Sequence, residues 1–218
     1  MRRLAALLLT TATLTACGQS DKSQDPLQVA ETLEAATPAH SPAQNATPPG
    51  TITPGGEFKD GGTTLKFQVN GKDVELDRLR SAVFEMTEDD KGAETRGAGL
   101  RAGDGATNAV ADRYGRLLVV DTRGGEFIAF SVNPLIMRQR YPVPGSPYGI
   151  AYDAKRDIAW ITLTERNEVV GLNVAGGEPA EKYRFPTVRQ PNTVSVDQES
   201  GHVTVTSGDN GGIQVISP

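Results

Sequence analysis

The side chains of this chain that are suited to chemistry are polar groups in turns: carboxylates, amides, guanidiniums and one tyrosine. Ten of them are our candidate ligand-binding residues: Asn108, Asp121, Arg123, Tyr148, Glu165, Arg166, Asn167, Asn192, Asp209 and Asn210. Such a mixture suits a small polar or sugar-like ligand, or a loop of a partner protein. Turns also favour Asp and Asn for backbone reasons, so a structural role is the alternative for each of these residues.

The sequence offers little for catalysis. Only His202 of the 2 histidines lies in the part expected to fold, which argues against histidine metal centres. Neither a Gly-x-Ser-x-Gly elbow nor a P-loop is present. We therefore predict no catalytic residue, no bound metal and no cofactor, and a non-catalytic binding or scaffold function. The alternative is a calcium-dependent lactonase or lyase for sugar-like substrates, whose cation would be held by oxygens of Asp121, Glu165, Asp209, Asn108 and Asn192.

The elements that must position these residues are internal repeats. Three copies of one pattern begin at Ala106, Pro147 and Pro191, so they are spaced by 41 and 44 residues. Their first strands end in Asp112, Asp153 and Asp197, which are in register. Equivalent aspartates after a strand are typical of turn caps that accept a backbone N–H, and we predict that role instead of a metal site.

Each copy contains short alternating strands separated by polar turns, as expected for the four-stranded antiparallel sheet of one β-propeller blade. A fainter copy precedes them, in which Asn70-Gly71 predicts a hairpin turn. Trp160 lies in an alternating strand and is expected in the core between blades. After its first strand, the copy that begins at Ala106 has predicted strands 117–120, 127–130 and 136–141, and the copy that begins at Pro147 has 158–161, 169–172 and 181–185. The copy that begins at Pro191 has 203–205 and 213–216, and the fainter copy has 65–69, 72–76, 82–86 and 94–100.

The fold class is therefore all-β, a propeller-like domain over residues 63–218 with units 63–105, 106–146, 147–190 and 191–218. The last unit lacks a fourth strand, and the segment 51–58 from the other end of the chain could supply it. Four units leave three arrangements open: a small closed ring, an incomplete propeller, or one that pairs with another chain. Loops between second and third strands, and between blades, are expected on one face around a central channel.

The N-terminal part has a different composition. Residues 1–16 combine Arg2 and Arg3 with an apolar stretch that is too short to span a bilayer, which indicates a cleaved export signal. Residues 17–62 are rich in Pro, Ala and Thr, and we expect a disordered linker that contains a solvated His40. The formal net charge of −5 argues against a nucleic-acid partner.

Two segments resemble known families. The segment Leu14-Thr15-Ala16-Cys17-Gly18 resembles the lipobox of bacterial lipoproteins, which implies a lipid on Cys17 and a location on the extracytoplasmic side of the cell membrane. Cys17 is also the only cysteine, so no internal disulfide can form. The repeats PYGIAYD and PNTVSVD resemble those of YVTN/NHL-type β-propellers of exported bacterial lipoproteins. Such relatives commonly have six or seven repeats, and this chain has four.

Overall fold

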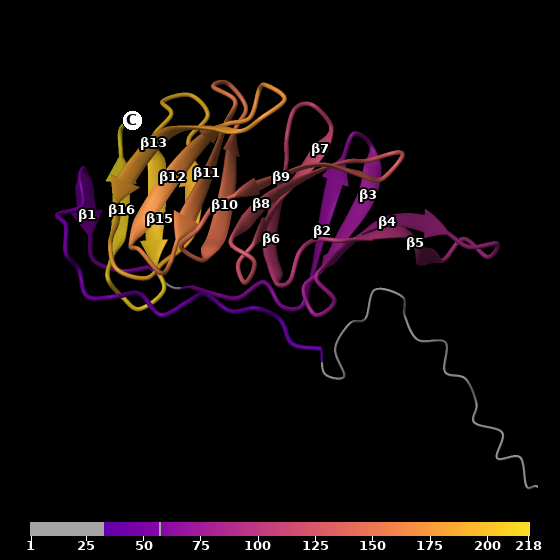
Figure 1. Cartoon of the computed structure of the whole chain (residues 1–218), viewed down its shortest axis with the longest axis horizontal. Coiled ribbons are helices and arrows are strands. Elements are labelled where there is room, and N and C mark those ends of the chain that lie inside the picture. The colour runs from indigo at the N-terminus through magenta and orange to yellow at the C-terminus, as the bar shows by residue number, and fades with distance from the viewer. Residues whose placement is uncertain (1–32, 57) are drawn as a thin grey trace, which may run out of the picture.

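The computed structural model describes residues 33–56 and 58–218, which consist of strands, turns and extended segments. Within these ranges no helix is long and apolar enough to cross a membrane. Cys17 and the predicted export signal lie outside the described residues. The strands form four antiparallel sheets of four strands each, arranged as propeller blades (Figure 1). The prediction of an all-β propeller fold is confirmed.

The first three blades are built from consecutive strands, whose bounds lie within two residues of those predicted. Asn70 and Gly71 have φ values of 51° and 76°, as the predicted hairpin turn requires. Blade 1 comprises β2 (Thr64–Val69), β3 (Lys72–Asp77), β4 (Ala82–Glu88) and β5 (Glu94–Arg101). Blade 2 comprises β6 (Ala106–Ala111), β7 (Arg116–Asp121), β8 (Glu126–Ser131) and β9 (Ile136–Pro142). Blade 3 comprises β10 (Pro147–Asp153), β11 (Ile158–Leu163), β12 (Glu168–Asn173) and β13 (Ala180–Pro186).

Blade 4 combines the two ends of the domain. It contains β14 (Pro191–Val196), β15 (Val203–Ser207) and β16 (Ile213–Ile216), and its fourth strand is β1 (Thr51–Thr53). β1 pairs antiparallel with β16, with Thr51 opposite Val215. The expected strand from the N-terminal side is therefore confirmed. It covers an edge whose backbone groups would otherwise be open to pairing with another molecule.

The blades pack face to face. Three apolar clusters fill the spaces between blades 1 and 2, 2 and 3, and 3 and 4, centred on buried residues such as Leu76, Leu118 and Val205. Burying each such side chain contributes about 1.5–3 kcal/mol. The innermost strands β2, β6, β10 and β14 contact one another in that order. Figure 1 shows blades 1 and 4 at opposite ends of this row, so the four blades form an open array.

Trp160 belongs to the third cluster, as predicted, and is 2% exposed. Its ring stacks on Tyr183 at 5.3 Å between centroids and on Phe185 at 6.3 Å. Both partners come from the outer strand β13, in which half-buried aromatics alternate with exposed Lys182 and Arg184. This alternation gives β13 one face toward the core and one toward water.

The three repeated aspartates cap turns. Asp112 accepts the backbone N–H groups of Tyr114 and Arg116 at 2.9 and 2.8 Å. Asp153 accepts the backbone N–H groups of Lys155 and Arg156. Asp197 accepts the backbone N–H of Ser200 at 2.6 Å. The predicted structural role is confirmed.

Residues 33–50 differ from the expectation of a disordered linker. This segment, here called the strap, runs along the lower edge of the blades to β1 (Figure 1). Its backbone bonds to the loops: Ser41 N donates to Gln190 Oε1 at 3.0 Å, and Ala39 O accepts from Gln190 Nε2 at 2.9 Å. His40 is exposed, as expected. Composition predicted disorder because the strap has little apolar surface to bury, but side chains of the loops hydrogen-bond its backbone instead.

We predict that Gln190→Ala releases the strap while the blades stay folded. The change removes two hydrogen bonds to the strap, each worth about 0.5–1.5 kcal/mol, so local opening should rise roughly tenfold or more. Hydrogen exchange of the backbone amides in 34–50 measures this opening. Gln198→Ala is the matched control, since Gln198 also makes two backbone hydrogen bonds, to Ala154 and Tyr152. Equal exchange in the strap of both variants would contradict the role of Gln190.

Candidate functional site

Asp121, a predicted ligand-binding residue, is a structural residue. It is fully buried and accepts the backbone N–H groups of Asp104, Gly105 and Gly124 at 2.9, 2.8 and 3.0 Å. A Cβ on Gly103 would lie 1.9 Å from the carboxylate, so the turn closes tightly around it. Asp121 therefore joins the β5–β6 connection to the β7–β8 turn, and its carboxylate does not face a ligand.

Two other candidates hold the strap. Arg123 donates from Nη2 to the carbonyl oxygen of Glu34 at 3.3 Å. Asn167 donates from Nδ2 to the carbonyl oxygen of Pro42 at 3.0 Å. The polar loop face expected to bind a partner is thus present, and the chain's own N-terminal segment lies on part of it.

The remaining loop candidates lie apart on the surface. Asp209 forms an ion pair with Arg189 at 2.7 Å, and Asn210 occupies an exposed turn position with φ of 65°. Glu165 accepts a hydrogen bond from Ser146 at 3.4 Å, and Arg166 is exposed. The structure does not bring these four residues into one site.

Asn108, Tyr148 and Asn192 do converge. They lie near the start of the innermost strands of blades 2, 3 and 4 and line one cavity of about 230 Å³; because the array is open, this cavity takes the place of the channel expected for a closed ring. In each of these strands the pairing register shifts at this point: between Ala106 and Asn108, between Pro147 and Ile150, and between Pro191 and Thr193. Such irregularities re-aim side chains next to sites. We name this hollow the central cavity.

Hydrogen bonds position these three residues. Asn108 donates from Nδ2 to the carbonyl oxygen of Tyr148 at 2.9 Å and so links blades 2 and 3. Asn192 Oδ1 accepts from Gln190 Nε2 at 3.0 Å. Burial raises the pKa of the Tyr148 hydroxyl, an effect that outweighs the nearby positive charge of Arg78. The hydroxyl therefore stays protonated at neutral pH.

The other wall of the central cavity is the segment 58–61, which connects blade 4 to blade 1. The Phe58 ring contacts Tyr148 edge to face at 5.8 Å between centroids. Asp60 forms an ion pair with Arg78, whose side chain is 1% exposed. This wall was not predicted from the sequence. A signal was present, because Phe58 is the only aromatic residue between 18 and 62 and glycine pairs flank it at 55–56 and 61–62.

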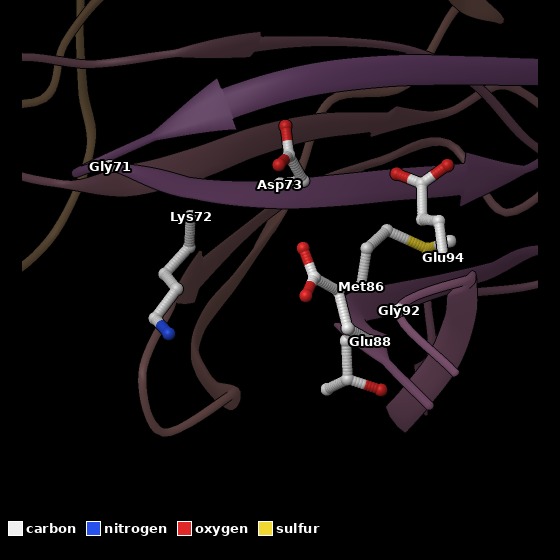
Figure 2. A pocket seen from close by; sticks show the side chains of 8 residues that line it. Gly71, Lys72, Asp73, Met86, Glu88, Gly92 and Glu94 are labelled. Carbon is white, nitrogen blue, oxygen red and sulfur yellow. The ribbon is translucent and has the colours of Figure 1, made fainter. Parts of the chain in front are cut away.

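A second hollow of about 490 Å³ lies on blade 1 alone, between the β2–β3 turn and the β4–β5 hairpin (Figure 2). Figure 2 shows Lys72 on one side and the carboxylates of Asp73, Glu88 and Glu94 on others. Asp73 accepts a hydrogen bond from Gln68, and Glu94 pairs with Lys66. This hollow is larger, but it lies on a single blade and no predicted site residue lines it. The central cavity is the better candidate site because three blades contribute to it.

The calcium site of the alternative hypothesis does not fit this arrangement. Among the described residues, no three His, Cys, Asp or Glu side chains gather as a metal site would require. Of the five proposed ligands, Asn108 and Asn192 line the central cavity, whereas Asp121 caps a turn and Asp209 pairs with Arg189. No reaction step through a cation follows from this geometry.

Comparisons with known proteins support the fold. The putative 6-phosphogluconolactonase of Bacteroides fragilis superposes with a TM-score of 0.60 at 13% identity, over 76% of this chain and 54% of that one. A gluconolactonase of Xanthomonas campestris superposes with a TM-score of 0.53 at 16% identity, over 70% of this chain and 61% of that one. The β-propeller domain of Cps50 (Swd1) from Myceliophteria thermophila superposes with a TM-score of 0.57 at 11% identity, over 70% of this chain and 52% of that one.

At these identities the likeness shows the β-propeller fold alone. The chain spans about half the length of the solved structures it matches. No protein-family model and no curated protein matches it.

We predict that Asp121→Ala destabilises the domain by roughly 3 kcal/mol or more. The change removes three hydrogen bonds to a charged acceptor, one of them buried and two partly buried, and each such bond is worth about 1.5–3 kcal/mol. Asp209→Ala, which removes a surface ion pair, should cost about 1 kcal/mol or less. Urea unfolding of both variants checks the difference. Equal losses would show that Asp121 is not the structural residue described here.

Proposed function

We propose that this chain is a non-catalytic, extracytoplasmic binding module that holds a small polar ligand in the central cavity. The observation that carries the proposal is the convergence of Asn108, Tyr148 and Asn192 from three blades opposite the segment 58–61. Side chains from distant parts of the chain reach one hollow there, with both amide and hydroxyl groups available. A rigid scaffold that presents convergent polar groups in a concave site is typical of ligand binding.

The size of the cavity limits the ligand. At about 230 Å³ it is smaller than the roughly 300–1,000 Å³ that drug-sized ligands occupy. An occupant about the size of a single hexose fits this volume. The wall also offers an apolar surface, because the Phe58 and Tyr148 rings pack together there.

A second candidate function is a lactonase-type enzyme for sugar-like substrates. The names of two similar solved structures favour it, since they are a putative 6-phosphogluconolactonase and a gluconolactonase. We place it second because Asp121 and Asp209, two of the carboxylates that it requires, serve as a turn cap and as an ion-pair partner.

Membrane anchoring is part of the proposal. The resemblance of residues 14–18 to a lipobox supports lipid attachment at Cys17, which lies outside the described residues. Stable anchoring takes more than one acyl chain, which a lipidated N-terminal cysteine would provide. The tether would hold the cavity, or a loop that binds a partner protein, at high local concentration near the membrane surface.

The ligand proposal is tested by thermal unfolding with D-glucose and D-glucuronate as probes. A ligand that binds only the folded chain adds about 2.7 kcal/mol at a hundredfold excess over Kd, which should raise Tm by several degrees. The shift should be smaller in Asn108→Ala and unchanged in the control Asn45→Ala, whose side chain is exposed on the strap. If neither sugar raises Tm, a hexose-sized site is contradicted. Calcium-dependent hydrolysis of D-gluconolactone would instead support the enzyme.

The anchor is tested separately in a bacterial host that processes lipoproteins. Wild-type protein should remain in the membrane fraction, and its mature N-terminus should carry acyl mass on Cys17. Cys17→Ser should appear in the soluble fraction, because the sulfur that accepts the lipid is gone. Membrane retention of Cys17→Ser without added mass would contradict the proposed anchor.

A further inference from the structure

We infer that the ligand of the central cavity is an anion whose acid group binds Arg78 and Tyr148 in place of Asp60. This inference rests on the proposed function and narrows its ligand class. The Arg78 guanidinium carries a positive charge that the proposed function does not use. Arg78 comes from the β3–β4 loop of blade 1, and its side chain reaches Tyr148 of blade 3 and the segment 58–61.

Arg78 is a buried cation that is incompletely satisfied. Its side chain is 1% exposed, and a guanidinium stays charged at any physiological pH. Nη1 donates to the carbonyl oxygen of Gly62 at 2.5 Å, and Nη2 makes long contacts of 3.3 Å to the carbonyl oxygen of Ala36 and 3.4 Å to Tyr148 Oη. Among the described residues, Nε has no hydrogen-bond partner. Asp60 contacts Nη1 through one carboxylate oxygen, so Nε and Nη2 lack a short charged partner. A buried guanidinium in this state favours a multidentate anion.

Asp60 is the counter-charge of Arg78, and its carboxylate can be displaced. Asp60 pairs with Arg78, but half of its side chain is exposed, so its carboxylate returns to water at little desolvation cost. Asp60 precedes Gly61 and Gly62; a Cβ placed on Gly61 would lie 2.8 Å from the Leu65 side chain, whereas no heavy atom lies within 4 Å of one placed on Gly62. The two glycines give the backbone after Asp60 conformational freedom.

Tyr148 supplies a second donor beside the guanidinium. Its hydroxyl oxygen accepts from Arg78, which leaves the hydroxyl proton for an acceptor on the other side. Burial keeps this hydroxyl neutral, so it donates to an anion and does not repel it. Both Tyr148 and Asp60 line the central cavity, so an acid group that displaces Asp60 places the rest of its molecule against Asn108 and Thr193.

The experiment measures binding of D-glucuronate and D-glucose, which differ at C6, by calorimetry. Wild type should bind D-glucuronate more tightly than D-glucose. Asp60→Asn should bind D-glucuronate roughly tenfold more tightly, because the competing carboxylate is gone, and its gain for D-glucose, which has no acid group, should be smaller. Asp104→Asn is the control, since Asp104 is an exposed aspartate at 3.9 Å from Arg101. Tyr148→Phe keeps the ring that packs on Phe58 and should weaken D-glucuronate binding about tenfold.

The outcomes separate the two proposals. Equal affinities for both sugars in wild type and in Asp60→Asn would overturn the anion inference and leave the proposed binding function standing. Weaker D-glucuronate binding in Asp60→Asn would also overturn it, because Asp60 would then be part of the binding site. If neither sugar binds any variant, the proposed function fails and the inference fails with it.

Discussion

The structure depends on the burial of sheet faces against one another. Blades 2 and 3 each have apolar side chains on both faces, and each is covered by a neighbour on both sides. Each end blade has one face that no other blade covers. On this face of blade 1, Arg96 forms ion pairs with Glu75 and Asp77 and lies over the Phe84 ring at 4.5 Å. These ion pairs place charged groups over the Phe84 ring on this end face.

Because the array is open, the chain itself spans it. The strap follows the loop face from blade 1 to blade 4, β1 completes blade 4, and the segment after β1 returns to blade 1 (Figure 1). The same route creates the central cavity, since it places residues 58–61 opposite the inner strands of blades 2, 3 and 4. The site is therefore a consequence of the route that the chain takes between blade 4 and blade 1. Its ligand class, in our inference, follows from Arg78, a cation that this route buries.

The blades were predictable because their signals are local. Alternation of apolar and polar residues with a period of two, repeated at 41 and 44 residues, predicts strands, turns and blade boundaries. The turn-capping role of Asp112 follows from the same repeat. The site was predicted in part: Asn108, Tyr148 and Asn192 share a cavity, while Arg123 and Asn167 bind the strap. A polar residue in a turn looks the same in sequence whether it contacts a ligand or its own chain.

What the sequence by itself determined is the sheet content, the repeat and the capping residues, because each depends on residues that are neighbours along the chain or one repeat apart. The tertiary structure alone decided that the array stays open, that the strap binds the loop face, and that Arg78 is buried beside Tyr148. These features join residues about 40 to 150 positions apart through single hydrogen bonds and ion pairs. Such contacts do not recur with a period along the chain, so no sequence pattern predicts them.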